Sequence, residues 1–319
     1  MPRPMNLDYR QLSYTEDRPP QERCFRLRTV LVPLIFIFLH FALQFFAALI
    51  VINSKIGEGR NPEELLADSS YIIMTLLLSG LLSILICALY LRHRRKNYGP
   101  GYCGLRKPGG DYYLAALSLA GSSLLLCNLI LAAWLALSER LPALKWMTES
   151  YNKSVAYMSS ENLALTILAS AVVVPIAEEV LLRGVIQSEL QAALRPSVAA
   201  LLTAVIFAVI HVEPVQVSYV FVAGLALSFL RLWSRSLWPS ILLHMVFNFF
   251  GGVLPQVLER YDLRWLGTVE FCLMLASLPL SLFFIRRFRR RRQEELKHWV
   301  EEVRTLEEEP LCVASTPAS

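Results

Sequence analysis

Charged residues are almost absent from long stretches of this sequence. Asp, Glu, Lys and Arg make up 18% of its 319 residues, whereas soluble domains contain about 25%. Val30–Ile52 carries no formal charge over 23 positions. Hydrophobic residues make up 55%, and the mean hydropathy is +0.46. This shortage of charge argues against a soluble two-domain enzyme and favours a single integral membrane domain.

The sequence also lacks the motifs of several enzyme and metal-site classes. The 6 cysteines are scattered without a Cys-x-x-Cys pair, so neither a disulfide framework nor a zinc knuckle is indicated. There is no His-Glu-x-x-His, because His211-Val-Glu213-Pro214-Val215 lacks the second histidine and is broken by proline. Neither Gly-x-Ser-Gly nor Gly-x-Gly-Asp occurs, which argues against rhomboid-type and presenilin-type proteases. No internal repeat is present.

Apolar blocks fill most of the chain, and several are long enough to cross the roughly 30 Å hydrocarbon core of a bilayer. The eight blocks are Val30–Ile52, Tyr71–Leu91, Tyr112–Leu137, Leu163–Leu182, Val198–Ile210, Val215–Leu230, Leu237–Leu254 and Leu266–Ile285. The first begins too late and is too long for a removable signal peptide. The sequence therefore predicts an all-α, polytopic membrane helix bundle of about eight transmembrane helices.

The placement of Lys and Arg predicts the topology. Positive residues concentrate before the first block, between the second and third, and after the last. By the positive-inside rule both termini are cytoplasmic, and we expect the plasma membrane as the location. The predicted regions are a cytoplasmic N-terminal arm (1–28), a transmembrane domain (29–285, motif core 163–252) and a cytoplasmic tail (286–319). The outer loop Ser138–Asn162 suits the membrane interface or a short surface helix.

The tail changes from basic to acidic along its length and is expected to continue the last span as a helix. Its arginines should attract anionic lipids, at about 1 kcal/mol each. A basic run beside a membrane span is an ordinary topology signal, so no nucleic-acid partner is expected.

Ionisable side chains interrupt the fourth block at Glu178, Glu179 and Arg183. Charges at that depth are costly and mark functional sites by default. Glu179 and Arg183 are four residues apart and can form an ion pair on one helix face, which a purely structural role would also explain. Glu178 points about 100° away and needs another partner. Pro175 should loosen the helix just before the pair.

Two further polar pairs at helical spacing follow, Phe207 with His211 and His244 with Asn248. Each could be no more than a packing or helix–helix hydrogen-bonding pair. His40 reads as a bystander in the first block. Counting along ideal helices from the predicted inner turns places Glu178 and His211 at the same depth in the membrane. It puts His244 roughly 10–15 Å nearer the cytoplasm, at 1.5 Å per residue.

Together these residues could carry hydrolytic chemistry. A carboxylate and an imidazole can activate a water, while a second imidazole and a carboxamide can donate hydrogen bonds to an oxyanion. Alternatively, two histidines and a glutamate could bind zinc and leave one position for water. The residues alone do not separate these two routes.

The three polar segments resemble the motifs of the CPBP family, which comprises CAAX-processing endopeptidases and bacteriocin-processing or immunity membrane proteins, also called Abi proteins. The matching segments are Glu178-Glu179-Val-Leu-Leu-Arg183, Phe207-Ala-Val-Ile-His211 and His244-Met-Val-Phe-Asn248. Pro175, Gly184 and Gly224 match in the flanks, and the resemblance covers about Leu163–Gly252.

The resemblance implies an intramembrane endopeptidase acting on a membrane-associated, possibly prenylated CAAX-type, protein or peptide. It implies Glu178 and His211 as the water-activating pair, and His244 with Asn248 as oxyanion stabilisers. Glu179, Arg183 and Phe207 become supporting residues. It implies a glutamate-dependent enzyme without a metal cofactor, despite the older label of metalloprotease, and zinc stays the alternative.

Two alternative functions stay open at this point. One is a non-catalytic immunity or scaffold protein of the same fold. The other is a proton-coupled transporter in which Glu178 and the histidines relay protons. Transporters more often show repeats or paired broken helices, which this chain lacks.

Overall fold

The computed structural model describes residues 25–56, 68–98, 104–157 and 162–308. Of the described residues 90% are helical, and none of them forms a β-strand. The helices of the first half are α1 (Leu27–Ile56), α3 (Ser69–Tyr98), α4 (Gly110–Arg140), the 3-10 turn η2 (Pro142–Leu144) and α5 (Lys145–Tyr157). The predicted all-α membrane bundle is confirmed.

The second half carries the three polar segments. It begins with α6 (Leu163–Thr166), η3 (Ile167–Val173), α7 (Val174–Glu179), η4 (Val180–Ile186) and α8 (Gln187–Gln191). These five run on as one span, Leu163–Gln191, which we call the motif helix. It is followed by α9 (Pro196–Val209), α10 (Pro214–Ser234), α11 (Leu237–Asn248), η5 (Phe249–Val253), α12 (Leu254–Arg260) and α13 (Trp265–Glu308).

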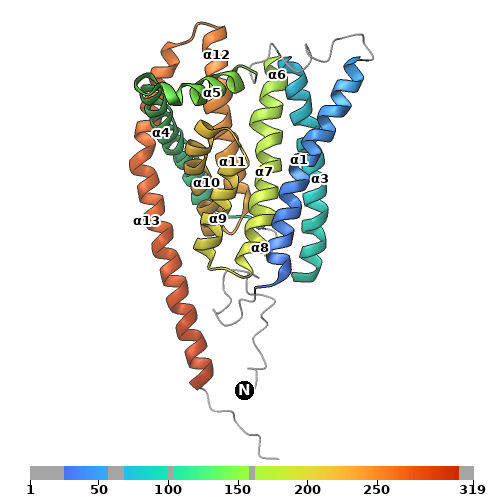
Figure 1. Ribbon diagram of the computed structural model, residues 1–319. Helices are drawn as coiled ribbons and strands as arrows, with labels where there is room; N and C mark the ends of the chain where they lie inside the picture. The colour runs from blue at the N-terminus through green and yellow to red at the C-terminus, as the bar shows by residue number, and fades with distance from the viewer. Residues whose placement is uncertain (1–24, 57–67, 99–103, 158–161, 309–319) are drawn as a thin grey trace, which may run out of the picture.

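Seven helical segments of the described chain are long and apolar enough to cross a membrane. The remaining one of the eight predicted spans, Val198–Ile210, corresponds to α9, which has only 14 residues. The first residues of α1 and the last of α13 lie at the same end of the bundle (Figure 1), as an even number of passes requires. The protein is an integral multi-pass membrane protein.

The motif helix lies inside the bundle, where α3, α9 and α11 pack against it. Leu181, Leu182, Val185 and Ile186 on this helix are at most 1% exposed. By contrast, α1 presents large apolar side chains outward, such as Phe38 at 75% exposure. A helix with an outward apolar face suits contact with lipid tails, so the protected interior is where polar side chains can meet.

Two peripheral helices follow the sequence predictions. Short helix α5 crosses one end of the bundle (Figure 1), as proposed for the outer loop, and its Tyr151 ring packs edge-on against Tyr219 of α10. Helix α13 continues without a break to Glu308 and extends beyond the other helices at the opposite end (Figure 1). Most of the predicted N-terminal arm (1–28), namely residues 1–24, lies outside the described residues.

A backbone pairing holds the turn between α10 and α11 inside the bundle. Leu105 forms an isolated antiparallel bridge with Ser236. The N–H of Leu237 donates to Gly104 O at 2.7 Å, and Ser236 Oγ donates to Arg106 O at 2.7 Å. These bonds satisfy polar groups of a turn that would otherwise need water, and they fix where α11 begins.

Candidate active site

The backbone of the motif helix is widened on both sides of the two glutamates. Segments η3 and η4 are π-helical, and the N–H of Val174 donates to Ala169 O, five residues back. Pro175 has no N–H to continue the ordinary ladder, which explains the loosening expected there. Single π-turns of this kind recur at functional sites.

Glu179 and Arg183 form the predicted ion pair, with Arg183 Nη1 2.7 Å from Glu179 Oε1 and both side chains 0% exposed. The other end of the guanidinium donates from Nη2 to Gly224 O at 3.1 Å. Its plane lies over the Phe207 ring, with Cζ 4.6 Å from the ring centroid. Arg183 thus binds the motif helix to both α9 and α10, and a neighbouring charge and ring partly offset its burial.

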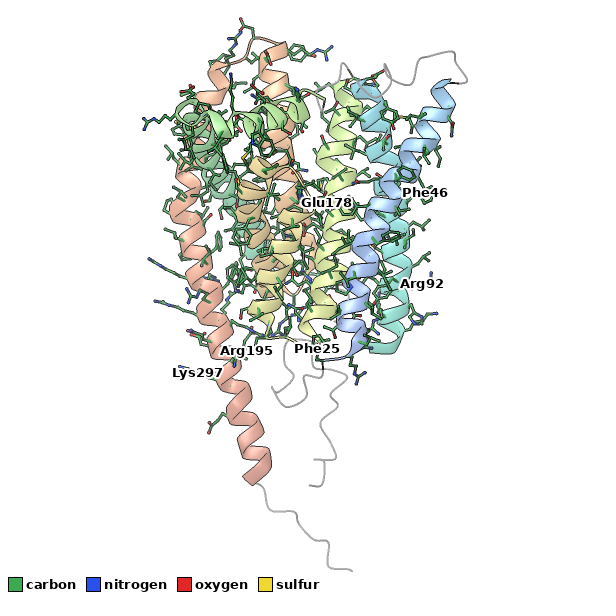
Figure 2. The ribbon with its side chains drawn as sticks, viewed as in Figure 1. Phe25, Phe46, Arg92, Glu178, Arg195 and Lys297 are labelled. Carbon is green, nitrogen blue, oxygen red and sulfur yellow. The ribbon has the colours of Figure 1, made fainter. Side chains whose placement is uncertain are left out.

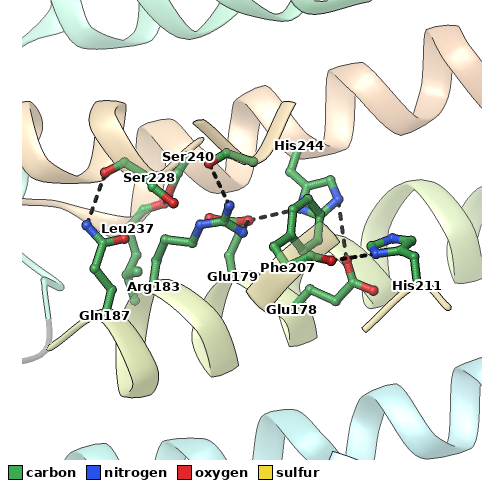
Figure 3. Close-up of polar contacts among 11 residues, drawn as sticks. Glu178, Glu179, Arg183, Gln187, Phe207, His211, Ser228, Leu237, Ser240 and His244 are labelled. Carbon is green, nitrogen blue, oxygen red and sulfur yellow. Dashed lines mark hydrogen bonds and ion pairs between the residues drawn. The ribbon is translucent and has the colours of Figure 1, made fainter. Parts of the chain in front are cut away.

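His244 of α11 lies between the two glutamates (Figure 3), and Glu178 is partway between the two ends of the bundle (Figure 2). Its Nδ1 is 3.0 Å from Glu179 Oε1, and its Nε2 is 3.5 Å from Glu178 Oε2. A carboxylate can only accept, so Nδ1 is the donor to Glu179. The bond from Nδ1 to the Glu179 carboxylate fixes the orientation of the ring, so that Nε2 points toward Glu178.

His211 is held at the C-terminal end of α9. Its Nδ1 donates to Phe207 O at 2.7 Å, which is one of the carbonyls that a helix leaves unpaired at its end. In the neutral ring this bond leaves Nε2 as an acceptor. The Phe207 ring lies edge-on to both His211 and His244, with centroids 4.9 and 5.5 Å apart. Glu178 points toward both histidines (Figure 3).

Asn248 lies one turn beyond His244 on α11. Its Nδ2 donates to Ser170 O at 2.9 Å, a carbonyl in the η3 segment of the motif helix. This bond links α11 to the widened turn and uses one of the two amide hydrogens. The second hydrogen is available for a ligand.

The expected depth difference of His244 is wrong, because its ring contacts both glutamates. Leu237, the first residue of α11, lies beside Gly184, where a Cβ would meet Leu237 Cδ1 at 3.5 Å. Gly184 follows Glu178 by six residues, a rise of about 9 Å along the motif helix. Leu237 precedes His244 by seven residues, a rise of about 10 Å along α11, so the two pairs are spaced alike along the bundle. The inner turn before α11 therefore lies deeper than the turn before α9.

Within the residues that the structure describes, no group of three or more His, Cys, Asp or Glu side chains is arranged to hold a metal ion. The donors that the zinc alternative would require do not form one ligand set here. Among these side chains, Glu178 pairs with His244 at 3.5 Å, while His211 bonds to the backbone carbonyl of Phe207.

Two groups outside the motifs were missed from the sequence. Glu189, 0% exposed at the end of the motif helix, lies 2.7 Å from Arg94 Nη2 and accepts from Tyr90 Oη at 2.7 Å. It fixes α3 against the motif helix; a Glu about two turns beyond an apolar block is the signal that was available. The second group is the His40–Gln44 pair of α1, in which the two Nε2 atoms are 3.1 Å apart and His40 lines a crevice with Leu181 of the motif helix; the description of His40 as a bystander stays a prediction.

The comparisons agree with the motifs. Residues 160–250 match the family model described as Type II CAAX prenyl endopeptidase Rce1-like, which confirms the resemblance to CAAX proteases. The match spans the motif helix, α9, α10 and α11. It supports an intramembrane protease function and a CAAX-type peptidase in general. Comparison with curated proteins and with solved structures gave no match.

Proposed function

We propose that this protein is a glutamate-dependent intramembrane endopeptidase, which hydrolyses a peptide bond in a membrane-associated protein or peptide. The observation that carries the proposal is the meeting of Glu178 with His244 from a separate helix, beside His211 at the end of a third. Separate helices of a membrane bundle gather costly polar groups where function requires them.

In the first step a water is deprotonated beside Glu178. The Glu178 carboxylate takes the proton, and His211 Nε2 accepts a hydrogen bond from the same water and orients it. The oxygen attacks the carbonyl carbon of the scissile peptide and gives a tetrahedral oxyanion. Positioned acid–base catalysis of this kind contributes about 10²–10⁴-fold to a rate.

The second step transfers the proton to the departing nitrogen. His244 Nε2–H and the second amide hydrogen of Asn248 stabilise the oxyanion, while Glu179 at Nδ1 stabilises a positively charged His244 ring. Protonated Glu178 gives its proton to the peptide nitrogen, the C–N bond breaks, and the carboxyl and amine products form. The water is consumed and Glu178 is regenerated as a carboxylate.

Prenylated CAAX-type proteins are the proposed substrate class, because the matched family model is described as a prenyl endopeptidase. We propose no metal cofactor, with zinc as the alternative that a chelator can test. We also place both termini in the cytoplasm and the protein in the plasma membrane; cysteine labelling from each side of the membrane tests the orientation.

Anionic lipids are the proposed partners of the basic part of α13, and no nucleic acid is proposed. Arg291 and Arg287 lie 2.7 and 3.7 Å from Asp111 of α4, whereas Arg286, Arg289 and Arg290 are exposed. Exposed arginines beside a membrane are free to meet lipid headgroups. Retention of phosphatidylglycerol by purified protein, compared with a variant carrying Gln at those three exposed positions, tests this proposal.

The test of the enzyme proposal uses purified protein in liposomes and a panel of peptides with and without a prenyl group. The parent should cleave at least one peptide, and Glu178→Gln should not cleave it although it elutes and melts as the parent does. Glu259→Gln on α12, an exposed position, is the matched control and should retain full activity. Cleavage by Glu178→Gln at the parental rate refutes the mechanism.

A further inference from the structure

A second layer of polar contacts joins the motif helix to α10 beyond Arg183. Gln187 is fully buried, and its Nε2 donates to the backbone oxygen of Ser228 at 3.1 Å (Figure 3). Arg183 Nη2 donates in the same way to Gly224 O at 3.1 Å. Gln187 follows Arg183 by four residues, and Ser228 follows Gly224 by four. The two layers are therefore about one helical turn apart along the same pair of facing helix surfaces.

The orientation of the Gln187 amide is fixed by this contact. A backbone oxygen can only accept a hydrogen bond, so the amide nitrogen faces Ser228 O and the amide oxygen, Oε1, is directed elsewhere. Among the residues that the structure describes, Oε1 meets no hydrogen-bond donor. A buried polar atom without a partner is costly, and each one in a native structure requires an explanation.

The hydroxyl of Ser228 is in the same situation. A serine inside a helix can donate to the carbonyl four residues earlier, which here belongs to Gly224. That oxygen already accepts from Arg183 Nη2, and in an α-helix it also accepts from the N–H of Ser228, so both of its lone pairs are used. Ser228 is 0% exposed, and its Oγ has no partner within the described part of the chain.

Arg183 supplies a third atom of this kind. Its Nη1 and Nη2 are bonded to Glu179 and Gly224, whereas its Nε–H meets no acceptor in the described ranges. The two layers thus hold one donor, one acceptor and one hydroxyl that can act as either. The positive charge of Arg183 disfavours a cation here, and the acceptor oxygen of Gln187 disfavours an anion. A neutral ligand that both donates and accepts fits this set, and buried water typically makes about three such bonds.

We propose that Gln187 Oε1 and Ser228 Oγ bind buried ordered water, which extends the hydrogen bonding to Arg183 Nε and is a constant part of the folded protein. The water donates to the Gln187 oxygen and accepts from the Ser228 hydroxyl or the Arg183 N–H, so that these buried groups are satisfied. It binds the motif helix to α10 next to the ion pair of Glu179 and Arg183.

The sign of a stability change tests the proposal. Ser228→Ala removes only the hydroxyl. A hydroxyl buried without any partner destabilises the protein, so its removal would raise the melting temperature, and alanine is also the better helix former. A hydroxyl that binds water stabilises the protein, so we expect Ser228→Ala to lower the melting temperature by about 2 °C, measured by size-exclusion chromatography in detergent. Ser118→Ala on α4 is the matched control, because this buried serine donates to Ala115 O at 3.1 Å within its own helix, and it should melt close to the parent.

A double variant tests whether Gln187 and Ser228 share the water. Gln187→Met keeps the length of the side chain, removes its amide and should also lower the melting temperature. Gln187→Met with Ser228→Ala should lower it by less than the two single shifts added together, because groups that share a partner are coupled. Ser228→Ala combined with Gln256→Leu on α12 is the control pair, and its shifts should add. Additive shifts for Gln187→Met and Ser228→Ala overturn a shared site.

A density map separates bound water from direct contact between the two side chains. Electron cryo-microscopy of the purified protein, at a resolution that shows ordered water, should reveal a peak within hydrogen-bond distance of Gln187 Oε1 and Ser228 Oγ. A map without this peak overturns the proposal, and so does a higher melting temperature for Ser228→Ala. None of these measurements uses a peptide substrate, so the bound water and the proposed peptidase activity can fail independently of each other.

Discussion

The Oε2 atom of Glu178 lies 3.5 Å from Nε2 of His244. The other nitrogen of that ring is bonded to Glu179, whose charge is balanced by Arg183 at 2.7 Å. Two consecutive carboxyl groups therefore have different roles. The buried Glu179 is committed to structure, while the partly exposed Glu178 keeps a carboxyl group that can exchange a proton.

Loss of the Asn248 amide should slow the chemical step with little effect on binding. Asn248→Leu removes one oxyanion donor, and we expect kcat to fall about 10²–10³-fold with KM changed less than about threefold. Steady-state kinetics on the best cleaved peptide measure both constants. Gln256→Leu on α12, at a partly exposed amide whose Nε2 donates to Gly252 O of η5 at 2.9 Å, is the control and should keep its kcat. An unchanged kcat in Asn248→Leu removes Asn248 from the oxyanion site.

Chelation should leave the activity unchanged, because the proposed water is activated by Glu178 and His211. Purified protein is incubated with EDTA or 1,10-phenanthroline, dialysed, and assayed with the same peptide. Zinc content measured on the same samples by mass spectrometry provides the reference. Activity that falls with zinc content and returns on zinc addition supports the zinc alternative instead.

Removing Arg183 should destabilise the protein strongly. Arg183→Met leaves Glu179 buried without its cation, and breaking a buried pair in this way costs about 3–5 kcal/mol. We expect a large fall in the melting temperature measured by size-exclusion chromatography in detergent. The double variant Glu179→Gln with Arg183→Met should recover part of the loss. Arg264→Gln, at a side chain that is 81% exposed, should melt as the parent does.

A methyl group at Gly224 should disturb the site through packing. A Cβ there would meet Phe207 Cδ1 at 3.0 Å and Ala204 Cα at 3.3 Å. Gly224→Ala must push α10 away from α9, which costs about 1–3 kcal/mol and moves the ring that contacts both histidines. We expect lower stability together with reduced kcat. Gly267→Ala, where a Cβ meets nothing within 4 Å, should change neither.

The turn after His211 holds strain that glycine can release. Val212 has φ of 62° and is 72% exposed, although branched side chains disfavour this left-handed region. Val212→Gly should raise stability by about 1 kcal/mol through relief of this strain, which a higher melting temperature would report. Val205→Gly, at an exposed position inside α9, should lower it. A lower melting temperature for Val212→Gly would show that the valine side chain stabilises the turn.

The sequence predicted the helices better than their relative depth. Apolar block length located the spans, and the spacing of Glu179 and Arg183 predicted their ion pair, because both follow from local helical geometry. The depth of His244 in the bundle depends on where α11 begins, and this is set by the pairing of Leu105 with Ser236. These two residues are 131 positions apart in the chain. No local pattern encodes such a contact.

The polar groups missed from the sequence share the same cause. A lone histidine in an apolar helix does not specify its facing neighbour, so the position of His40 beside Leu181 required the packing of α1 on the motif helix. In the sequence, Glu189 is a single charged residue near the end of a predicted span, and Arg94 is one of the positive residues used to predict topology. Their 2.7 Å contact appears only in the folded bundle.

The guanidinium of Arg183 receives its full set of contacts only when Phe207 and Gly224 have arrived from later segments of the chain. Until the hairpin of α9 and α10 has inserted, the Glu179–Arg183 ion pair of the motif helix lacks the Gly224 carbonyl and the Phe207 ring. We therefore expect a chain truncated before that hairpin to hold its motif helix less stably in the membrane.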